Sequence, residues 1–179
     1  MTYSFKSKKI ILLIIVFSPF FLSAQYDYLK KEGNQLIFEK VYKLDTIFNE
    51  NIASTLIDRI TKIKDVTNVL YTNEIITAKI SDSYIDYKQY GGKWGNTPVY
   101  MNHPFCADIS IVWKEGRYKV TANNMYFNTN TSLFGKWKCY EIFINNNGFN
   151  LNKNVVRTGK YIEQYLSELF LISALDSTW

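Results

Sequence analysis

The sequence contains few of the residues that most often perform catalysis or bind metals. Among its 179 residues there are one histidine, His103, and two cysteines, Cys106 and Cys139. A single histidine excludes histidine-rich zinc sites and the His-Glu-x-x-His motif. The sequence also lacks a Gly-x-Ser-x-Gly elbow, a phosphate-binding glycine loop and a dinucleotide fingerprint. These absences exclude the enzyme classes that such motifs identify.

His103 and the two cysteines could in principle combine, either as three metal ligands or as a Cys-His nucleophile pair. However, His103 and Cys106 are three positions apart, and in an extended chain such residues point to opposite faces. We therefore expect no metal site and no cofactor.

The N-terminus has the pattern of an export signal. Three lysines precede an apolar run, residues 10–17, which continues past a Ser-Pro pair to Leu22 and ends in the sequence LSAQ. A basic segment, a short apolar core and small residues before the cut are typical of a secretory signal peptide. The alternative is a membrane anchor, but a span needs about 20 apolar residues, and this run is shorter and interrupted. We predict a signal peptide over residues 1–24, cleavage after Ala24, and a periplasmic or extracellular mature protein without a membrane span.

Cleavage would leave residues 25–179, a length that suits one domain. The full chain has 21 lysines and arginines against 16 acidic residues, a net charge of +5. Three of those lysines belong to the signal peptide, so the mature chain has 18 basic against 16 acidic residues, a charge of +2. The remaining lysines are scattered rather than gathered in a basic stripe, so nucleic acid is not an expected partner.

Export also affects the expectation for Cys106 and Cys139, because disulfides persist outside the cytoplasm. Two cysteines permit one intramolecular pairing, and we expect a bridge between them. The alternative is that they are small buried apolar side chains. Their separation in the sequence does not decide between these possibilities.

The first half of the mature chain changes from a strand pattern to a helix pattern and back. Residues 34–44 alternate as a strand does. Asn49 and Glu50 can begin a helix, whose apolar residues then recur at spacings of three and four. Two strands follow within residues 66–88. Residues 90–104 contain three glycines and two prolines, which indicates a loop.

The second half contains a hairpin and a final helix. Residues 107–127 form two alternating runs, and Gly116 between them can supply the positive φ of a tight loop. Residues 133–144 alternate as a further strand would, and a turn-rich linker follows. Apolar residues from Ile162 onward have helical spacing, which places Glu163 on the polar side. These patterns predict one α+β domain, with two main helices packed on one face of an antiparallel sheet.

Several of these segments, in this order, resemble one family. They are LIFEKVYKL, the helix that follows it, TNEIITAKI, and the hairpin ADISIVWKEGRYKVTANNMYF, and they cover about residues 36–127. The chain is similar here to a Bacteroidota family of exported domains of unknown function with a TATA-binding-protein-like fold. The resemblance implies a curved antiparallel sheet with helices on one face. It implies no activity, because a fold does not supply a function. The glycine-rich insert at 90–104 and the cysteines depart from the pattern.

Asp82 and Asp86 are the first candidate site. Both would lie on one face of a strand, where two carboxylates could perform acid-base chemistry on a glycoside. Alternating polar residues equally describe the solvent face of an antiparallel sheet. A small hydrolase that uses Asp82, Asp86 or His103 is therefore the alternative function.

Aromatic residues in the predicted loop are the second candidate site. Aromatic residues make up 17% of the chain, and Tyr90, Trp94 and Tyr100 lie in the loop with His103 beside them. Flat apolar rings with polar edges recur at binding surfaces, although these rings could instead fold back over the end of the sheet. We favour a non-catalytic binding or interaction module of the cell envelope, with an envelope protein or a glycan as its partner, and binding through this loop requires Trp94 to be exposed.

Overall fold

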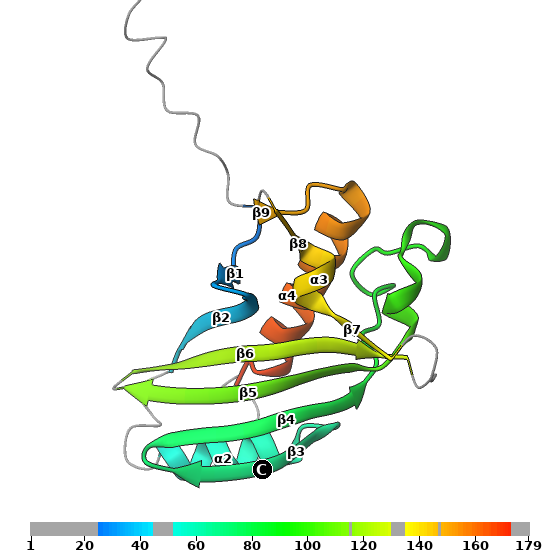
Figure 1. The fold of residues 1–179 in the computed structure, drawn as a ribbon. Helices are drawn as coiled ribbons and strands as arrows, with labels where there is room; N and C mark the ends of the chain where they lie inside the picture. Colours follow the sequence, from blue (N-terminus) through cyan, green and yellow to red (C-terminus); the bar gives the residue numbers. More distant parts are fainter. Residues whose placement is uncertain (1–24, 45–51, 115, 130–134, 147, 173–179) are drawn as a thin grey trace, which may run out of the picture.

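The computed structural model describes residues 25–44, 52–114, 116–129, 135–146 and 148–172, and Figure 1 shows their arrangement. The predicted signal peptide, residues 1–24, lies outside the described residues. So do Asn49 and Glu50, the predicted start of the first helix. The described residues form one seven-stranded sheet with its main helices on one face.

All neighbouring strands of this sheet are antiparallel, as predicted. The order is β1-β2-β6-β5-β4-β3, and β7 pairs with β6. The strands are β1 (Leu29–Glu32), β2 (Gln35–Lys43), β3 (Val66–Thr72), β4 (Ile75–Ser83), β5 (Phe105–Lys114), β6 (Arg117–Asn128) and β7 (Lys136–Lys138).

The predicted central hairpin consists of β5 and β6. Ile109 pairs with Ala122 and Ile111 pairs with Val120, and all four side chains are buried. Gly116 has a φ of 69° in the connection, a conformation that glycine adopts without a steric penalty. The apolar face of this hairpin is the centre of the core.

Two main helices cover this face (Figure 1). They are α2 (Ile52–Lys62) and α4 (Lys153–Leu169). Leu56 and Ile60 of α2, and Ile162 and Leu166 of α4, are almost fully buried. Each pair is four residues apart and therefore lies on one side of its helix. Burial of each such side chain stabilises the fold by about 1.5–3 kcal/mol. The predicted α+β arrangement is confirmed.

Three strands of the sheet contain β-bulges. Asn68 in β3, Asp82 in β4 and Asn124 in β6 have φ values of 53°, 54° and 48°, and each lies where the register with the neighbouring strand shifts. Asn and Asp tolerate this left-handed conformation better than other non-glycine residues. A bulge bends its strand and increases the local twist, so these three positions explain why the sheet curves.

The strand predicted over residues 133–144 is wrong for most of its length. Only Lys136–Lys138 and Ile144, the first residue of a further short strand, have strand structure there, and Cys139–Phe143 forms a short helix, α3. Residues 133 and 134 lie outside the described part of the chain. Cys139 and Phe143 are both fully buried, and their separation of four positions is that of one helix face. This helical spacing was not recognised in the sequence, because apolar residues on both faces of the presumed strand fit either structure.

Several short elements were not predicted. In the presumed linker, β8 (Ile144–Asn145) pairs with β9 (Gly148–Phe149). The loop at 90–104 contains two 3₁₀ turns, η2 (Trp94–Asn96) and η3 (Val99–Asn102). At the other end of the sheet, β1 is added beside β2.

Candidate functional site

Tyr100 and His103, two of the four candidate residues in the loop, pack against aromatic side chains at the end of the sheet. Tyr100 lies edge-on to Trp137, with ring centres 5.9 Å apart, and also contacts Phe127 at 5.2 Å. His103 lies edge-on to the same tryptophan at 5.4 Å. Burial is the largest cause that raises the pKa of Tyr100 to about 12, so its hydroxyl stays protonated. Tyr100 and His103 therefore close the end of the sheet.

Trp94 has the opposite environment. Its side chain is 78% exposed, as the binding hypothesis requires. It begins η2, a single turn in which the amide of Asn96 donates to the carbonyl of Lys93 at 3.0 Å. The hydroxyl of Thr97 donates to the same carbonyl at 2.9 Å. The exposed indole is thus attached to a backbone turn with its own hydrogen bonds.

The loop is also fixed to its surroundings on both sides of Trp94. On one side, the amide of Gly92 donates to the carbonyl of Tyr87 at 2.9 Å. A Cβ atom at Gly92 would lie 2.6 Å from that carbonyl oxygen and 3.2 Å from the Tyr161 ring, so only glycine fits there. On the other side, the Arg157 guanidinium of α4 donates to the carbonyl of Asn96 at 3.5 Å.

The loop and α4 line an open surface hollow of about 480 Å³. Its lining combines aromatic, cationic and amide side chains from both elements, and we call it the loop-α4 hollow. The lining residues are Tyr90, Gly91, Lys93, Asn96, Arg157, Lys160, Tyr161 and Gln164. Trp94 stands between two of them in the sequence. In Figure 1 the loop is the green segment that approaches the orange part of α4.

Two tyrosines form one wall of the hollow. The Tyr90 ring stacks on Tyr161, with centres 6.2 Å apart and planes 23° apart. The Tyr90 hydroxyl donates to the Glu168 carboxylate at 2.9 Å. Burial, followed by this bond, raises the pKa of Tyr90 well above its ordinary value. Tyr90 is therefore an oriented, neutral ring rather than an acid or a base.

The charges around the hollow are mostly positive. Lys93 and Lys160 are exposed, and neither forms an ion pair within the part of the chain that the structure describes. Arg157 is half-buried, and its guanidinium donates to the neutral carbonyl of Asn96. The nearby acid, Glu168, binds the neutral hydroxyl of Tyr90. These cations remain available to an anionic group.

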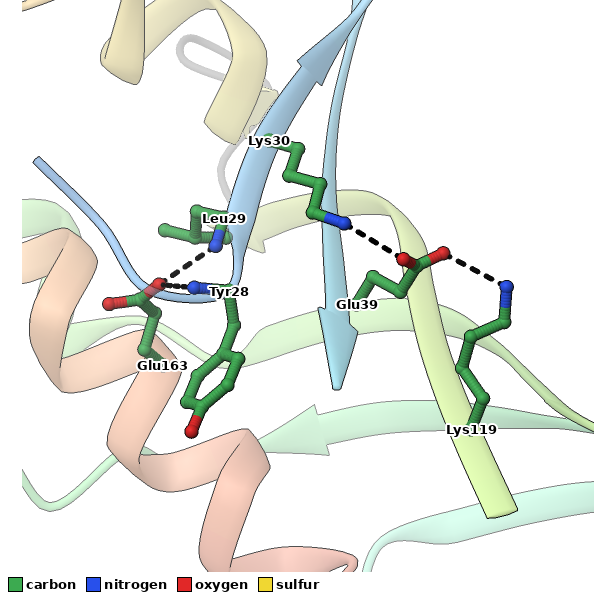
Figure 2. Close-up of polar contacts among 6 residues, drawn as sticks. All are labelled: Tyr28, Leu29, Lys30, Glu39, Lys119 and Glu163. Carbon is green, nitrogen blue, oxygen red and sulfur yellow. Dashed lines mark hydrogen bonds and ion pairs between the residues drawn. The ribbon is translucent and has the colours of Figure 1, made fainter. Parts of the chain in front are cut away.

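Glu163 lies on α4 between Lys160 and Gln164, and Figure 2 shows its contacts. We expected it on the polar side of the helix, which is wrong, since only 5% of the residue is exposed. Its carboxylate accepts hydrogen bonds from the amides of Tyr28 at 2.5 Å and Leu29 at 2.8 Å. Burial raises the pKa of Glu163, and these two bonds partly oppose the increase. The bonds join α4 to β1 and fix the helix that lines the hollow.

A second carboxylate in Figure 2 has the opposite environment. Glu39 of β2 binds Lys30 of β1 at 2.8 Å and Lys119 of β6 at 3.0 Å. The bonds to Lys30 and then Lys119 lower the pKa of Glu39. Because all three side chains are partly exposed, this bridge across three strands contributes about 0–1 kcal/mol per pair.

The two aspartates of the first candidate site have separate structural tasks. Asp82 lies in the β4 bulge, where its Oδ1 accepts from Asn128 at 3.4 Å and from the Cys106 thiol at 3.9 Å. Asp86 lies after the end of β4, where its Oδ1 accepts from the amide of Lys88 at 3.1 Å. Among the described residues no hydrogen bond joins the two carboxylates or links either of them to His103.

The structure holds Cys106 and Cys139 as free, buried thiols, which differs from the disulfide we expected. Phe105 points toward α4, where it contacts Tyr165, so Cys106 points to the opposite face of β5. Cys139 lies in the core on the helix side, and burial strongly raises its pKa. The sheet thus separates the two sulfur atoms.

The described residues contain no group of three or more histidine, cysteine, aspartate or glutamate side chains that could hold a metal ion. None of the helices in the described ranges is long and apolar enough to cross a membrane.

Neither a protein-family model nor a curated protein matches this chain. A solved structure of a DUF4468 family protein from Bacteroides ovatus is similar, with a TM-score of 0.50 and 11% identity over 84% of this chain and 94% of that chain. A TBP-like protein from Parabacteroides distasonis has a TM-score of 0.45 and 13% identity over 79% and 94% of the two chains. At such low identity, the likeness to the first structure shows the fold alone. The fold of this chain is therefore that of a Bacteroidota domain of unknown function, as the resemblance in the sequence implied.

Proposed function

We propose that the protein is a non-catalytic binding module of the cell envelope, exported by a signal peptide, and that its loop at residues 90–104 contacts the ligand. The observation that carries this proposal is the 78% exposure of Trp94 on a loop fixed through Gly92 and Asn96. Large aromatic side chains on rigid supports are frequent anchors of binding surfaces, since little conformational entropy is lost when they bind.

The surroundings of the candidate acids support binding more than hydrolysis. The Asp86 carboxylate accepts a hydrogen bond from a backbone amide in a turn, and the Asp82 carboxylate accepts one from a side-chain amide. His103 packs on Trp137. A glycoside hydrolase needs two carboxylates that face one substrate at a set distance. Hydrogen bonds of this kind stabilise a turn at Asp86 and a β-bulge at Asp82, which is a structural role for both aspartates.

A Trp94→Ala substitution tests the proposal. The exported protein, produced from the full chain, would be mixed with the insoluble envelope fraction of the producing cells, and bound protein would be measured by cosedimentation. We expect at least a tenfold loss of affinity, because a central aromatic anchor is worth more than about 1.4 kcal/mol. The free energy of unfolding should change by less than about 0.5 kcal/mol, since the side chain is exposed.

Tyr84→Ala is the matched control, because Tyr84 is also aromatic and 64% exposed but lies outside the loop at residues 90–104. This variant should keep both its affinity and its stability. If Trp94→Ala instead unfolds more easily and binds unchanged, Trp94 is a packing residue and the loop is not the binding site.

A further inference from the structure

The cations of the loop-α4 hollow come from two elements that are distant in the sequence. Lys93 belongs to the loop, whereas Arg157 and Lys160 belong to one side of α4, and all three line the same 480 Å³ hollow. Like charges placed together repel one another and lower stability unless an anion joins them. Within the described ranges, no carboxylate forms an ion pair with any of the three.

Arg157 is the best oriented of these cations. The residue is half-buried, and its guanidinium donates a hydrogen bond to the Asn96 carbonyl at 3.5 Å. A guanidinium has five N–H donors in a planar fork, which matches the two oxygen atoms of a carboxylate. Lys93 and Lys160 add mobile point charges beside it.

The remaining lining residues suit a sugar ring. Tyr90, stacked on the buried Tyr161, offers a flat apolar wall. Trp94 follows Lys93 in the chain, and its exposed ring lies outside the lining of the hollow. The amides of Asn96 and Gln164 are exposed and can both donate to and accept from hydroxyl groups. Four lining side chains are exposed, so the hollow is open enough to admit part of a long chain: Lys93, Asn96, Lys160 and Gln164.

We propose that the loop-α4 hollow binds an acidic polysaccharide, with a sugar ring on Tyr90 and Trp94 and its carboxylate near Arg157, Lys93 and Lys160. This inference rests on the proposed function and adds the ligand class to it. Apolar rings select the sugar face, and the cations select the charge, so both features are needed for the specificity.

Homogalacturonan oligosaccharides provide a matched pair of probes, because the free acid and its methyl ester differ only at the carboxyl group, which is charged in the acid and neutral in the ester. Binding of each to the exported protein would be measured by titration calorimetry at low ionic strength. We expect the acid to bind at least tenfold more tightly than the ester, and its affinity to fall with added salt.

Two double variants locate the effect. Lys93→Gln with Lys160→Gln removes two charges from the hollow, and Lys31→Gln with Lys43→Gln removes the same charge from exposed strand positions elsewhere. We expect the first to bind the acid at least tenfold more weakly and the second to bind within twofold of the original protein. An equal loss in both would mean that net charge alone attracts the probe, which would overturn the proposal.

Other outcomes separate this inference from the proposed function. If acid and ester bind equally and Trp94→Ala abolishes both, the hollow binds sugars without charge selection, and only the acidic class is overturned. Failure to bind either oligosaccharide overturns the inference, while the envelope cosedimentation with Trp94→Ala still decides the proposed function. Equally tight, hollow-dependent binding of poly-glutamate would show a site for acidic peptides instead.

Discussion

Glu163 illustrates how one residue departs from the helical pattern around it. Its spacing in α4 predicts a solvent-facing position, yet its carboxylate is buried and accepts the amides of Tyr28 and Leu29. The signal that would reveal this is absent from α4 itself, because the two donors belong to the backbone of a segment more than 130 residues away. A buried acid is tolerated where such bonds replace water.

Removing this acceptor should destabilise the protein. Glu163→Ala leaves one buried and one partly buried amide without their partner, and we expect a loss of about 1–3 kcal/mol in the free energy of unfolding. Glu163→Gln keeps one acceptor oxygen and should lose less. Urea denaturation would measure both, with the exposed neighbour Gln164→Ala as the control that changes by less than about 0.5 kcal/mol. Equal stability of all three variants would contradict the role of Glu163.

The same residue should affect the pH dependence of stability. Its pKa in the folded protein is raised above the ordinary value of 4.5, chiefly by burial. The folded state therefore binds this proton more tightly than the unfolded state, and the advantage is lost as the pH rises through the raised pKa. We expect the original protein to lose stability relative to Glu163→Gln between the ordinary and the raised pKa. Glu39, whose pKa is lowered, acts in the opposite direction and loses its contribution as the pH falls.

At the scale of an element, the loop at residues 90–104 depends on one close approach. Gly92 lies where any Cβ atom would meet the Tyr87 carbonyl, whereas a Cβ atom at Gly95 would have no neighbour within 4 Å. The two glycines differ because the chain at position 92 packs against Tyr87 and Tyr161, whereas the chain at position 95, just after Trp94, has no such neighbours. The position of the exposed tryptophan is therefore set by packing at Gly92.

Gly92→Ala should disturb the loop, and Gly95→Ala is its control. The extra methyl group at position 92 must displace backbone, which costs about 1–3 kcal/mol, and it should also weaken envelope binding because Trp94 moves with the loop. Gly95→Ala should change the stability by less than about 0.5 kcal/mol. Thermal unfolding with the cosedimentation assay would measure both effects, and two equally stable variants would show that the loop accommodates the methyl group.

Elements with a clear period could be predicted from the sequence, whereas those made by distant partners could not. The β5–β6 hairpin alternates regularly and α4 repeats at helical spacing, so both were found. By contrast, β1 has four residues, three of them charged and exposed, and pairing with β2 defines it. Exposure of Trp94 could not be predicted, because an aromatic ring in such a loop can equally fold back over the end of the sheet. Nor could the hollow, because nothing local to Lys93 indicates that Arg157 and Lys160 lie beside it.

At the scale of the whole molecule, the described fold includes residues directly after the expected cleavage point. Tyr26 is 5% exposed and packs against Phe143 and Phe149. A Cβ atom at Gly159 would lie within 2.3 Å of the Tyr26 ring, so α4 approaches this ring as closely as glycine allows. The segment before β1 is thus part of the core rather than a linker.

This packing makes the site of maturation a sharp test of the export proposal. Cleavage after Ala24 would leave Gln25 as the first residue, and its side-chain amide donates to the carbonyl of Asn150 at 3.0 Å. Cleavage a few residues later would remove Tyr26, whose aromatic burial contributes a few kcal/mol. We therefore expect the intact mass of protein recovered from the producing cells to correspond to residues 25–179. A mass that includes Met1 would contradict export by cleavage, and a chain that begins after Tyr26 would contradict the structural role of that ring.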